Sequence, residues 1–303
     1  MENLPEDFWA TSGAYTPHIY RDQYPSIDPT TASLSQAGKV IIITGASSGI
    51  GARGFAPAFA KAGAKALVLV ARNQTKLKET ASTIQAINPA VETSVFAADV
   101  SEESEVAKLY EVVKARYGHA DVLINNAGAF NQESPIIAAN PSKWWADFEV
   151  NVKGVFLMAK YFLDLLGKGR EGTVITMNTG LATVVVPGQS AYSISKMASL
   201  RITEFLAAEN PNVSAVSLQP GVVKTDMVTE SFQRFAQDTP ELVGGTGVWL
   251  ATDSARFLSG RFVSANWSVD DLKMQMNELV SGNDLKMVLH GKFGLDPTRP
   301  QGE

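Results

Sequence analysis

Cysteine is absent from the 303-residue sequence. Its absence excludes disulfides, catalysis by a thiolate and metal sites built on cysteine. Histidine is nearly as scarce, because only His18, His119 and His290 occur, far apart and without metal-ligand spacing. We therefore expect no metal centre.

Long apolar runs and an excess of basic charge are also missing. No stretch approaches the roughly 20 apolar residues that span a bilayer, and the acidic start, residues 1–7, has no signal-peptide run. The formal net charge of −5 provides no broad basic face for nucleic acid or an anionic membrane. We expect a soluble, cytoplasmic protein without nucleic-acid or membrane partners.

The remaining pattern is a regular alternation of strands and helices in a chain that is 45% hydrophobic. This order is typical of an α/β fold, a doubly wound parallel β-sheet of about seven strands flanked by helices (Rossmann-type), in one domain. The predicted strands cover residues 39–44, 66–71, 92–97, 120–125, 173–177, 213–218 and 261–264. The predicted helices cover residues 52–62, 74–87, 102–117, 141–166, 192–208, 242–251 and 270–280.

Residues 1–37 form a separate segment, which we call the arm. Its prolines exclude a long helix, while its aromatic residues argue against a disordered chain. We interpret it as an extended arm lying on the domain or on a partner subunit; an unattached leader is the alternative. The main domain is predicted over residues 38–283, and a tail over residues 284–303.

A glycine-rich turn, Thr44-Gly45-Ala46-Ser47-Ser48-Gly49-Ile50-Gly51, joins the first predicted strand to a helix. Glycines let the backbone approach a pyrophosphate, and a helix N-terminus supplies free N–H groups and a positive dipole end. The alternative is a plain tight turn. We predict that the cofactor-binding residues here are Gly45, Ser47, Ser48, Gly49 and Ile50.

The end of the second predicted strand indicates which dinucleotide binds. NAD sites place an acid about 20 residues beyond the glycines, but Ala71 and Arg72 occupy that stretch here. A guanidinium suits a 2′-phosphate because its planar fork pairs with phosphate oxygens. We predict NADP(H), although a solvated surface arginine is the alternative.

Two more strand ends carry residues to the edge where ligands bind in such sheets. Asp99 and Val100 end the third predicted strand, and Asn125 and Ala127 belong to the Asn-Asn-Ala-Gly run after the fourth. We predict cofactor contacts at all four. The alternatives are a helix cap at Asp99 and a simple turn at the second run.

The reaction centre is predicted around Tyr192 and Lys196, which lie one helical turn apart. A phenol with a pKa near ~10 is a poor base at neutral pH, and a nearby ammonium lowers that pKa. Thr179 offers a hydroxyl at the end of the fifth strand. Asn151 is a polar residue in an apolar helix stripe and needs partners if buried. For Thr179 and Asn151, a purely structural role is the alternative.

Together, over residues 38–265, these motifs resemble the short-chain dehydrogenase/reductase family in its single-domain form. The order matches: TGxxxGxG, the strand-three Asp, NNAG, a helix Asn, a hydroxyl residue, YxxxK and a Pro-Gly motif. The resemblance implies further cofactor contacts at Pro220, Val223 and Thr225. The arm resembles those of reductase-like proteins from filamentous fungi, which hints at secondary metabolism.

The resemblance also implies roles. Tyr192 would be the acid/base, Lys196 would lower its pKa and hold the nicotinamide ribose, and Asn151 would support a proton relay. Thr179 stands where the family usually has Ser. Residues 226–243, which we call the lid segment, would cover the substrate. The lid segment is rich in apolar residues, which implies a hydrophobic substrate.

We therefore expect an NADP(H)-dependent oxidoreductase that interconverts a hydrophobic ketone or aldehyde and an alcohol. The alternatives are a non-redox isomerase, dehydratase or cyclase on the same fold, and a dinucleotide-sensing regulator. Helix 141–166 is apolar on several faces. Members of the family pair through this helix and the Tyr/Lys helix, which implies a homodimer or homotetramer, unless the arm covers that face.

Overall fold

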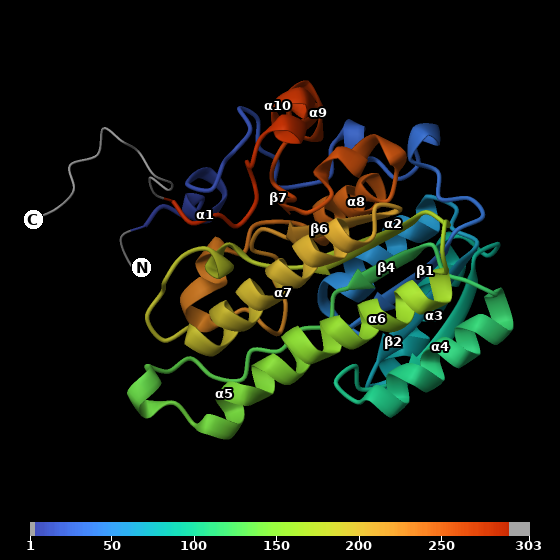
Figure 1. Ribbon diagram of the computed structural model, residues 1–303, viewed down its shortest axis with the longest axis horizontal. Coiled ribbons are helices and arrows are strands. Elements are labelled where there is room, and N and C mark those ends of the chain that lie inside the picture. Colours follow the sequence, from blue (N-terminus) through green and yellow to red (C-terminus); the bar gives the residue numbers. More distant parts are fainter. Residues whose placement is uncertain (1–3, 291–303) are drawn as a thin grey trace, which may run out of the picture.

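The computed structural model describes residues 4–290. Seven parallel strands form one sheet in the order β3-β2-β1-β4-β5-β6-β7, which confirms the predicted doubly wound α/β fold (Figure 1). The strands are β1 (Val40–Thr44), β2 (Ala66–Ala71), β3 (Glu92–Ala97), β4 (Val122–Asn125), β5 (Gly172–Met177), β6 (Val213–Gln219) and β7 (Arg261–Ser264).

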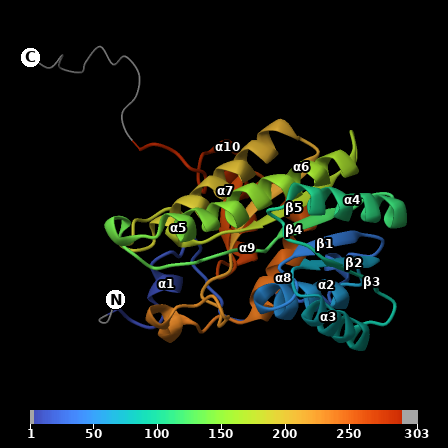
Figure 2. The ribbon, with the colours of Figure 1, turned by 90° about the horizontal axis from the view of Figure 1, so that it is seen from below.

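Helices cover both faces of this sheet. In Figure 2, α4, α5, α6 and α7 lie on one face, and α2, α3 and α8 lie on the other. The bounds are α2 (Ala56–Lys61), α3 (Gln74–Ile87), α4 (Glu103–Tyr117), α5 (Pro141–Phe148), α6 (Val155–Leu166), α7 (Ser190–Glu209), α8 (Pro240–Leu250), α9 (Val269–Met274) and α10 (Met276–Ser281). Within residues 4–290, no helix combines the length and apolarity needed to span a membrane.

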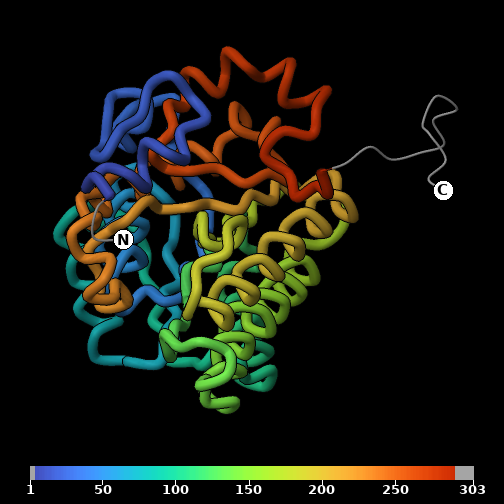
Figure 3. The backbone as a smooth tube through the Cα atoms, turned by 90° about the vertical axis from the view of Figure 1, so that its left-hand side faces the viewer, coloured from blue at the N-terminus to red at the C-terminus, as the bar shows by residue number. Residues whose placement is uncertain are grey.

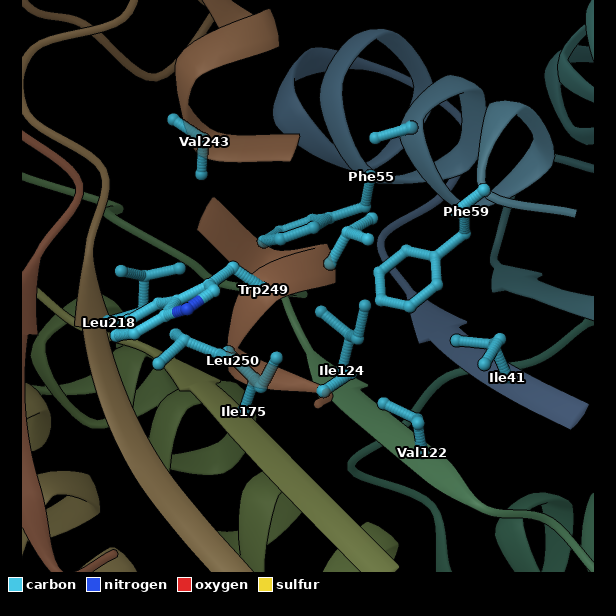
Figure 4. Close-up of a cluster of buried hydrophobic side chains, with 14 of the residues drawn as sticks. Ile41, Phe55, Phe59, Val122, Ile124, Ile175, Leu218, Val243, Trp249 and Leu250 are labelled. Carbon is cyan, nitrogen blue, oxygen red and sulfur yellow. The ribbon is translucent and has the colours of Figure 1, made fainter. Parts of the chain in front are cut away.

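The core consists of two apolar layers, one on each side of the sheet. Successive strand side chains point to opposite faces, so Ile41 belongs to the layer beneath α2 and α8, while Ile42 belongs to the layer beneath α4 and α6. Figure 4 shows the first layer, where Trp249 of α8 lies near Phe55 and Ile124. Burial on both faces fixes the strands and therefore the positions of their C-terminal ends.

Two helices contain π-helical segments. The helix that follows β1 begins with η3 (Gly51–Phe55) and continues as α2. Pro57, in the first turn of α2, has no N–H to bond to the carbonyl four residues back. The predicted helix 141–166 is continuous but contains η5 (Glu149–Gly154) between α5 and α6. Such π segments occur frequently at functional sites, and η5 holds Asn151.

The described part of the arm, residues 4–37, lies along α8, α9 and the segment between β7 and α9 (Figure 3). Ile19 forms an antiparallel bridge with Trp267, and the N–H of Tyr20 donates to the carbonyl of Asn266 at 2.7 Å. Ile27, fully buried, packs against Gly245 of α8. These contacts lie on the α8 face of the sheet, so the alternative in which the arm covers helix 141–166 is wrong.

The lid segment is not uniform. It contains the 3₁₀ helix η7 (Glu230–Phe235), and its last residues, from Pro240 on, form the first turn of α8. The predicted tail is described only as far as residue 290. Its remaining part, residues 291–303, lies outside the described residues.

Candidate active site

A cavity of about 590 Å³, which we call the first cavity, runs along the C-terminal ends of the strands. Its position spans the point between β1 and β4 where the strand order reverses, the usual ligand site in open α/β sheets. Most of the predicted cofactor residues line it: Gly45, Ser47, Ser48, Gly49, Ile50, Arg72, Asp99, Val100, Ala127, Tyr192, Lys196, Pro220 and Thr225.

The glycine loop requires glycine at several positions. Gly45 and Gly49 have φ angles of 64° and 56°, which L side chains rarely adopt. A Cβ on Gly51 would lie 2.4 Å from the carbonyl oxygen of Gly45, so the helix packs directly on the turn. The loop therefore presents bare backbone and the first N–H groups of a helix to the cavity, an arrangement suited to a phosphate.

The two consecutive asparagines at the end of β4 occupy different places. The side chain of Asn126 lines the first cavity, donating to the carbonyl oxygens of Thr44 at 2.9 Å and Gly45 at 3.3 Å. Asn125 is the last residue of β4 and is buried, with its Nδ2 unpaired among the described residues. Asn125, the predicted cofactor contact, therefore does not line the first cavity, whereas Asn126 lines it and braces the glycine loop.

Arg72 and Asp99 lie at the outer end of the first cavity. The Arg72 side chain is 81% exposed, and its Nη1 is 4.0 Å from Oδ2 of Asp99. Although burial raises the pKa of Asp99, hydrogen bonds from Ser101 and the Arg72 charge hold that pKa below its usual value. Asp99 does not cap α4, whose N-cap is Glu102. Most of the Arg72 donors are thus available to a ligand in this cavity.

Lys196 is buried on α7 beneath Tyr192. Its Nζ donates to the carbonyl oxygen of Met177, at the end of β5, at 2.9 Å, and lies 5.8 Å from the centre of the Tyr192 ring. Tyr192 and Lys196 both line the first cavity, as their spacing on one helix face predicts. The sheet and α7 together hold the pair at the inner end of the cavity.

Asn151 lies behind this pair and is fully buried. Its Nδ2 donates to the carbonyl oxygen of Ala129 at 2.9 Å and to Ser195 Oγ at 3.0 Å, while its Oδ1 accepts the N–H of Ala129 at 2.9 Å. The amide is thus satisfied, as a buried polar group must be. It ties the loop after β4 to α7 instead of lining the first cavity.

Burial dominates the titration of the pair. Burial raises the pKa of Tyr192 to about 12, with a further increase from the negative charge of Asp147. Burial lowers the pKa of Lys196 to about 8, and Asp147 opposes that decrease. Burial and the charge of Asp147 thus raise the pKa of Tyr192 in this structure, and a lowering of that pKa by Lys196 stays a prediction.

Asp147 was not among the predicted site residues. This carboxyl group is fully buried; its Oδ1 accepts hydrogen bonds from the N–H of Asn131 at 3.0 Å and from Asn131 Nδ2 at 2.7 Å. Burial raises the pKa of Asp147. A signal existed, because an acid four residues before Asn151 falls on the same helix face.

A second cavity, of about 190 Å³, adjoins the first. Thr179 and Val223 line it, and Tyr192 lines both cavities. Thr179 Oγ1 accepts the N–H of Leu181 at 3.2 Å, which leaves its own proton for another acceptor. Thr179 and Tyr192 thus line one cavity, and Val223, a predicted cofactor contact, lines this second cavity and not the first.

The fold and the two joined cavities define a dinucleotide-binding α/β protein. The family model for short chain dehydrogenases matches residues 39–235, and the chain belongs to this family. The family consists of oxidoreductases that use a nicotinamide cofactor. The resemblance carried by the sequence motifs is thus confirmed.

Relatives and solved structures agree with this assignment. The chain is 39% identical to the short chain dehydrogenase citE of Monascus ruber over 278 residues, covering 89% of this chain and 94% of citE. It is 34% identical to the short chain dehydrogenase andI of Emericella variicolor, covering 85% and 92%. A short chain dehydrogenase from Shigella flexneri complexed with NADP is 26% identical with a TM-score of 0.70, covering 78% and 99%. Another from Escherichia coli CFT073, complexed with NADPH, is also 26% identical, with a TM-score of 0.71 and the same coverage.

Proposed function

We propose that this protein is an NADP(H)-dependent oxidoreductase that interconverts a hydrophobic ketone or aldehyde and an alcohol. One observation carries the proposal: Tyr192, with Lys196 one turn further along α7, lines both the first and the second cavity. A proton donor at that junction can reach a carbonyl oxygen in the second cavity beside a cofactor in the first.

The first cavity fits the cofactor at both ends. The glycine loop from Gly45 to Gly51 would hold the pyrophosphate on backbone N–H groups, and Arg72 would pair with the 2′-phosphate. NADP and NADPH are bound in two structures similar to this chain. When bound, the cofactor supplies or accepts the hydride. Lys196 would hold the nicotinamide ribose, at the inner end of the cavity.

Tyr192 would act as the acid in the reductive direction. Its pKa of about 12 keeps the phenol protonated at neutral pH, so it can donate a proton to the carbonyl oxygen. Thr179 would donate a second hydrogen bond to that oxygen from the opposite wall. In the oxidative direction the phenol must first lose its proton, and we expect that direction to require alkaline pH.

Asn151 would act as a positioning residue. Its amide is engaged by Ala129 and Ser195, so it fixes the loop after β4 against the helix carrying Tyr192. A Cβ on Gly128 would lie 3.4 Å from Asn151 Oδ1 and 3.5 Å from Lys196 Nζ. Glycine at this position thus keeps open the space between the amide and the ammonium, where a proton relay could run.

We further propose that the protein is a homodimer or homotetramer assembled through α6 and α7. Phe156 on α6 is 52% exposed and Phe205 on α7 is 58% exposed. These helices lie side by side on the sheet face opposite the arm (Figure 2). Pairing there would bury both rings and brace the helices that hold the reaction centre.

Purified protein, NADPH and a panel of lipophilic carbonyl compounds test the catalytic proposal. We expect loss of NADPH absorbance with at least one compound, and no turnover by Tyr192→Phe, which retains the ring but lacks the proton donor. NADPH should bind the variant nearly as tightly as the unmutated protein. NADPH consumption retained by Tyr192→Phe would contradict the assignment of Tyr192 as the proton donor, whereas no NADPH consumption by the unmutated protein with any compound would favour the non-redox alternative.

A further inference from the structure

Aromatic rings from three distant parts of the chain line the second cavity. They belong to Trp9 of the arm, Phe130 after β4 and Phe232 of the lid segment. We propose that the substrate is a planar aromatic carbonyl compound carrying a second oxygen, that Trp9 forms one wall of its site, and that Gln189 binds the second oxygen. This inference rests on the proposed carbonyl chemistry at Tyr192 and defines its substrate class.

The rings form two pairs that border the cavity, and one of these pairs includes Tyr192. Trp9 stacks on Phe232 with ring centres 5.6 Å apart and an interplanar angle of 30°. Phe130 meets Tyr192 edge-on, with ring centres 5.3 Å apart and an angle of 65°. A flat aromatic ligand gains stacking or edge contacts on such surfaces beyond simple burial of apolar area. An aliphatic chain of similar size would gain only the burial.

The arm is anchored to the lid segment, so Trp9 is held in place. Arg21 Nε donates to Oδ1 of the buried Asp238 at 2.8 Å, and the N–H of Thr239 donates to the carbonyl oxygen of Arg21 at 2.9 Å. Gln237 Nε2 donates to Glu6 at 2.8 Å. Because Asp238 also accepts the N–H of Val222 at 2.6 Å, these bonds connect the arm to the loop after β6.

Buried polar groups without partners indicate the second oxygen. Gln189 is 2% exposed and lines the second cavity, and within residues 4–290 its hydrogen bonds are made by its main-chain N–H and carbonyl, not by its side-chain amide. The indole Nε1 of Trp9, which the protein encloses, is also unpaired among the described residues. Leaving such groups unpaired is costly. A ligand oxygen would satisfy the Gln189 amide, whereas a wholly apolar ligand would leave it unpaired.

Binding to NADP⁺-loaded Tyr192→Phe tests the inference without turnover. The probes are naphthaldehyde, its isomers carrying one ring hydroxyl, and undecanal, which has the same number of carbons. Calorimetry should show naphthaldehyde binding more tightly than undecanal, and at least one hydroxyl isomer binding more tightly still. Undecanal binding as tightly as naphthaldehyde, or no isomer exceeding the parent, would overturn the inference.

Variants of Trp9 and Gln189, made in the NADP⁺-loaded Tyr192→Phe protein, show which side chain provides each gain in affinity. Trp9→Leu should weaken naphthaldehyde binding about threefold to tenfold and undecanal binding less than twofold. Trp9→Phe keeps an aromatic ring and should retain most of the affinity for naphthaldehyde. Trp145→Leu makes the same substitution at an exposed tryptophan of α5 that lines neither cavity, and it should change the affinity for neither aldehyde. Gln189→Leu should weaken only the hydroxyl isomer, by about fivefold. Equal losses for both aldehydes in Trp9→Leu would overturn the role of the wall.

The two proposals fail differently. If the unmutated protein reduces none of these aldehydes with NADPH but Tyr192→Phe shows the expected binding order, the catalytic proposal fails and the site remains. If the unmutated protein reduces undecanal and naphthaldehyde with equal kcat/KM, the catalytic proposal stands and the substrate class is wrong.

Discussion

Replacing Lys196 with methionine should stabilise the cofactor-free protein while abolishing turnover. Burial lowers the pKa of Lys196 from 10.5 to about 8, which means that the folded protein disfavours the charged lysine. At about 1.4 kcal/mol per pKa unit, that decrease corresponds to about 3 kcal/mol. Methionine removes the charge at similar length but also removes the hydrogen bond to Met177, which costs about 1 kcal/mol. We expect a net gain of about 2 kcal/mol at pH 7.

The stability gained by Lys196→Met should depend on pH, in a direction that follows from the lowered pKa of Lys196. Below pH 8, Lys196 is charged in both the folded and the unfolded protein, so the folded protein bears the full free-energy cost of burying that charge. Between pH 8 and 10.5 the folded protein loses the proton first, and the stability of the unmutated protein rises. The advantage of Lys196→Met should therefore be largest near neutral pH and disappear as the pH approaches 10.5.

Urea unfolding of both proteins without cofactor, at pH 7 and pH 10, measures the free energy of unfolding directly. Lys160→Met is the control, because Lys160 is about half exposed on α6, and its effect should stay within about 0.5 kcal/mol. The reasoning would be refuted if Lys196→Met destabilised the protein at pH 7, or if its advantage grew with pH.

Three further variants test other parts of the site. Arg72→Ala should weaken NADPH binding about tenfold and leave NADH binding unchanged, because only NADPH carries the phosphate that the guanidinium would pair with; equal weakening, measured by cofactor fluorescence, would contradict this. Asp147→Asn removes a charge that raises the Tyr192 pKa, so the rise in the rate of alcohol oxidation with pH should occur at lower pH. A pH–rate profile that does not move would argue against Tyr192 as the titrating group. Light scattering should find an oligomer that Phe156→Lys with Phe205→Lys converts to a monomer; a monomeric unmutated protein would rule out the assembly.

Much of the fold could be predicted from local patterns. The strand β1 is a run of β-branched residues buried on both faces, and such runs are typical of parallel sheets. The extent of helix 141–166 also followed from periodicity, but its π segment around Asn151 did not. Periodicity detects which faces are apolar, whereas a shift in backbone hydrogen bonding changes that pattern too little to be noticed.

The site was harder to predict where contacts join distant segments. Nothing local distinguishes Asn125 from Asn126, since the choice depends on where strand β4 ends and which side chain then faces the glycine loop. Trp9 reaches the second cavity only because the arm folds back on the lid segment. The pKa of Tyr192 depends on desolvation by the whole surrounding fold, which the spacing of Tyr192 and Lys196 does not reveal.

The central claim is that a hydride passes between the cofactor and a carbonyl carbon at Tyr192. Incubating the protein with an accepted aldehyde and NADPH deuterated at the transferring position, followed by mass spectrometry of the product, tests it directly. The account predicts an alcohol with one deuterium on the former carbonyl carbon, and none formed by Tyr192→Phe. A product without deuterium, formed while the NADPH remains unconsumed, would contradict it.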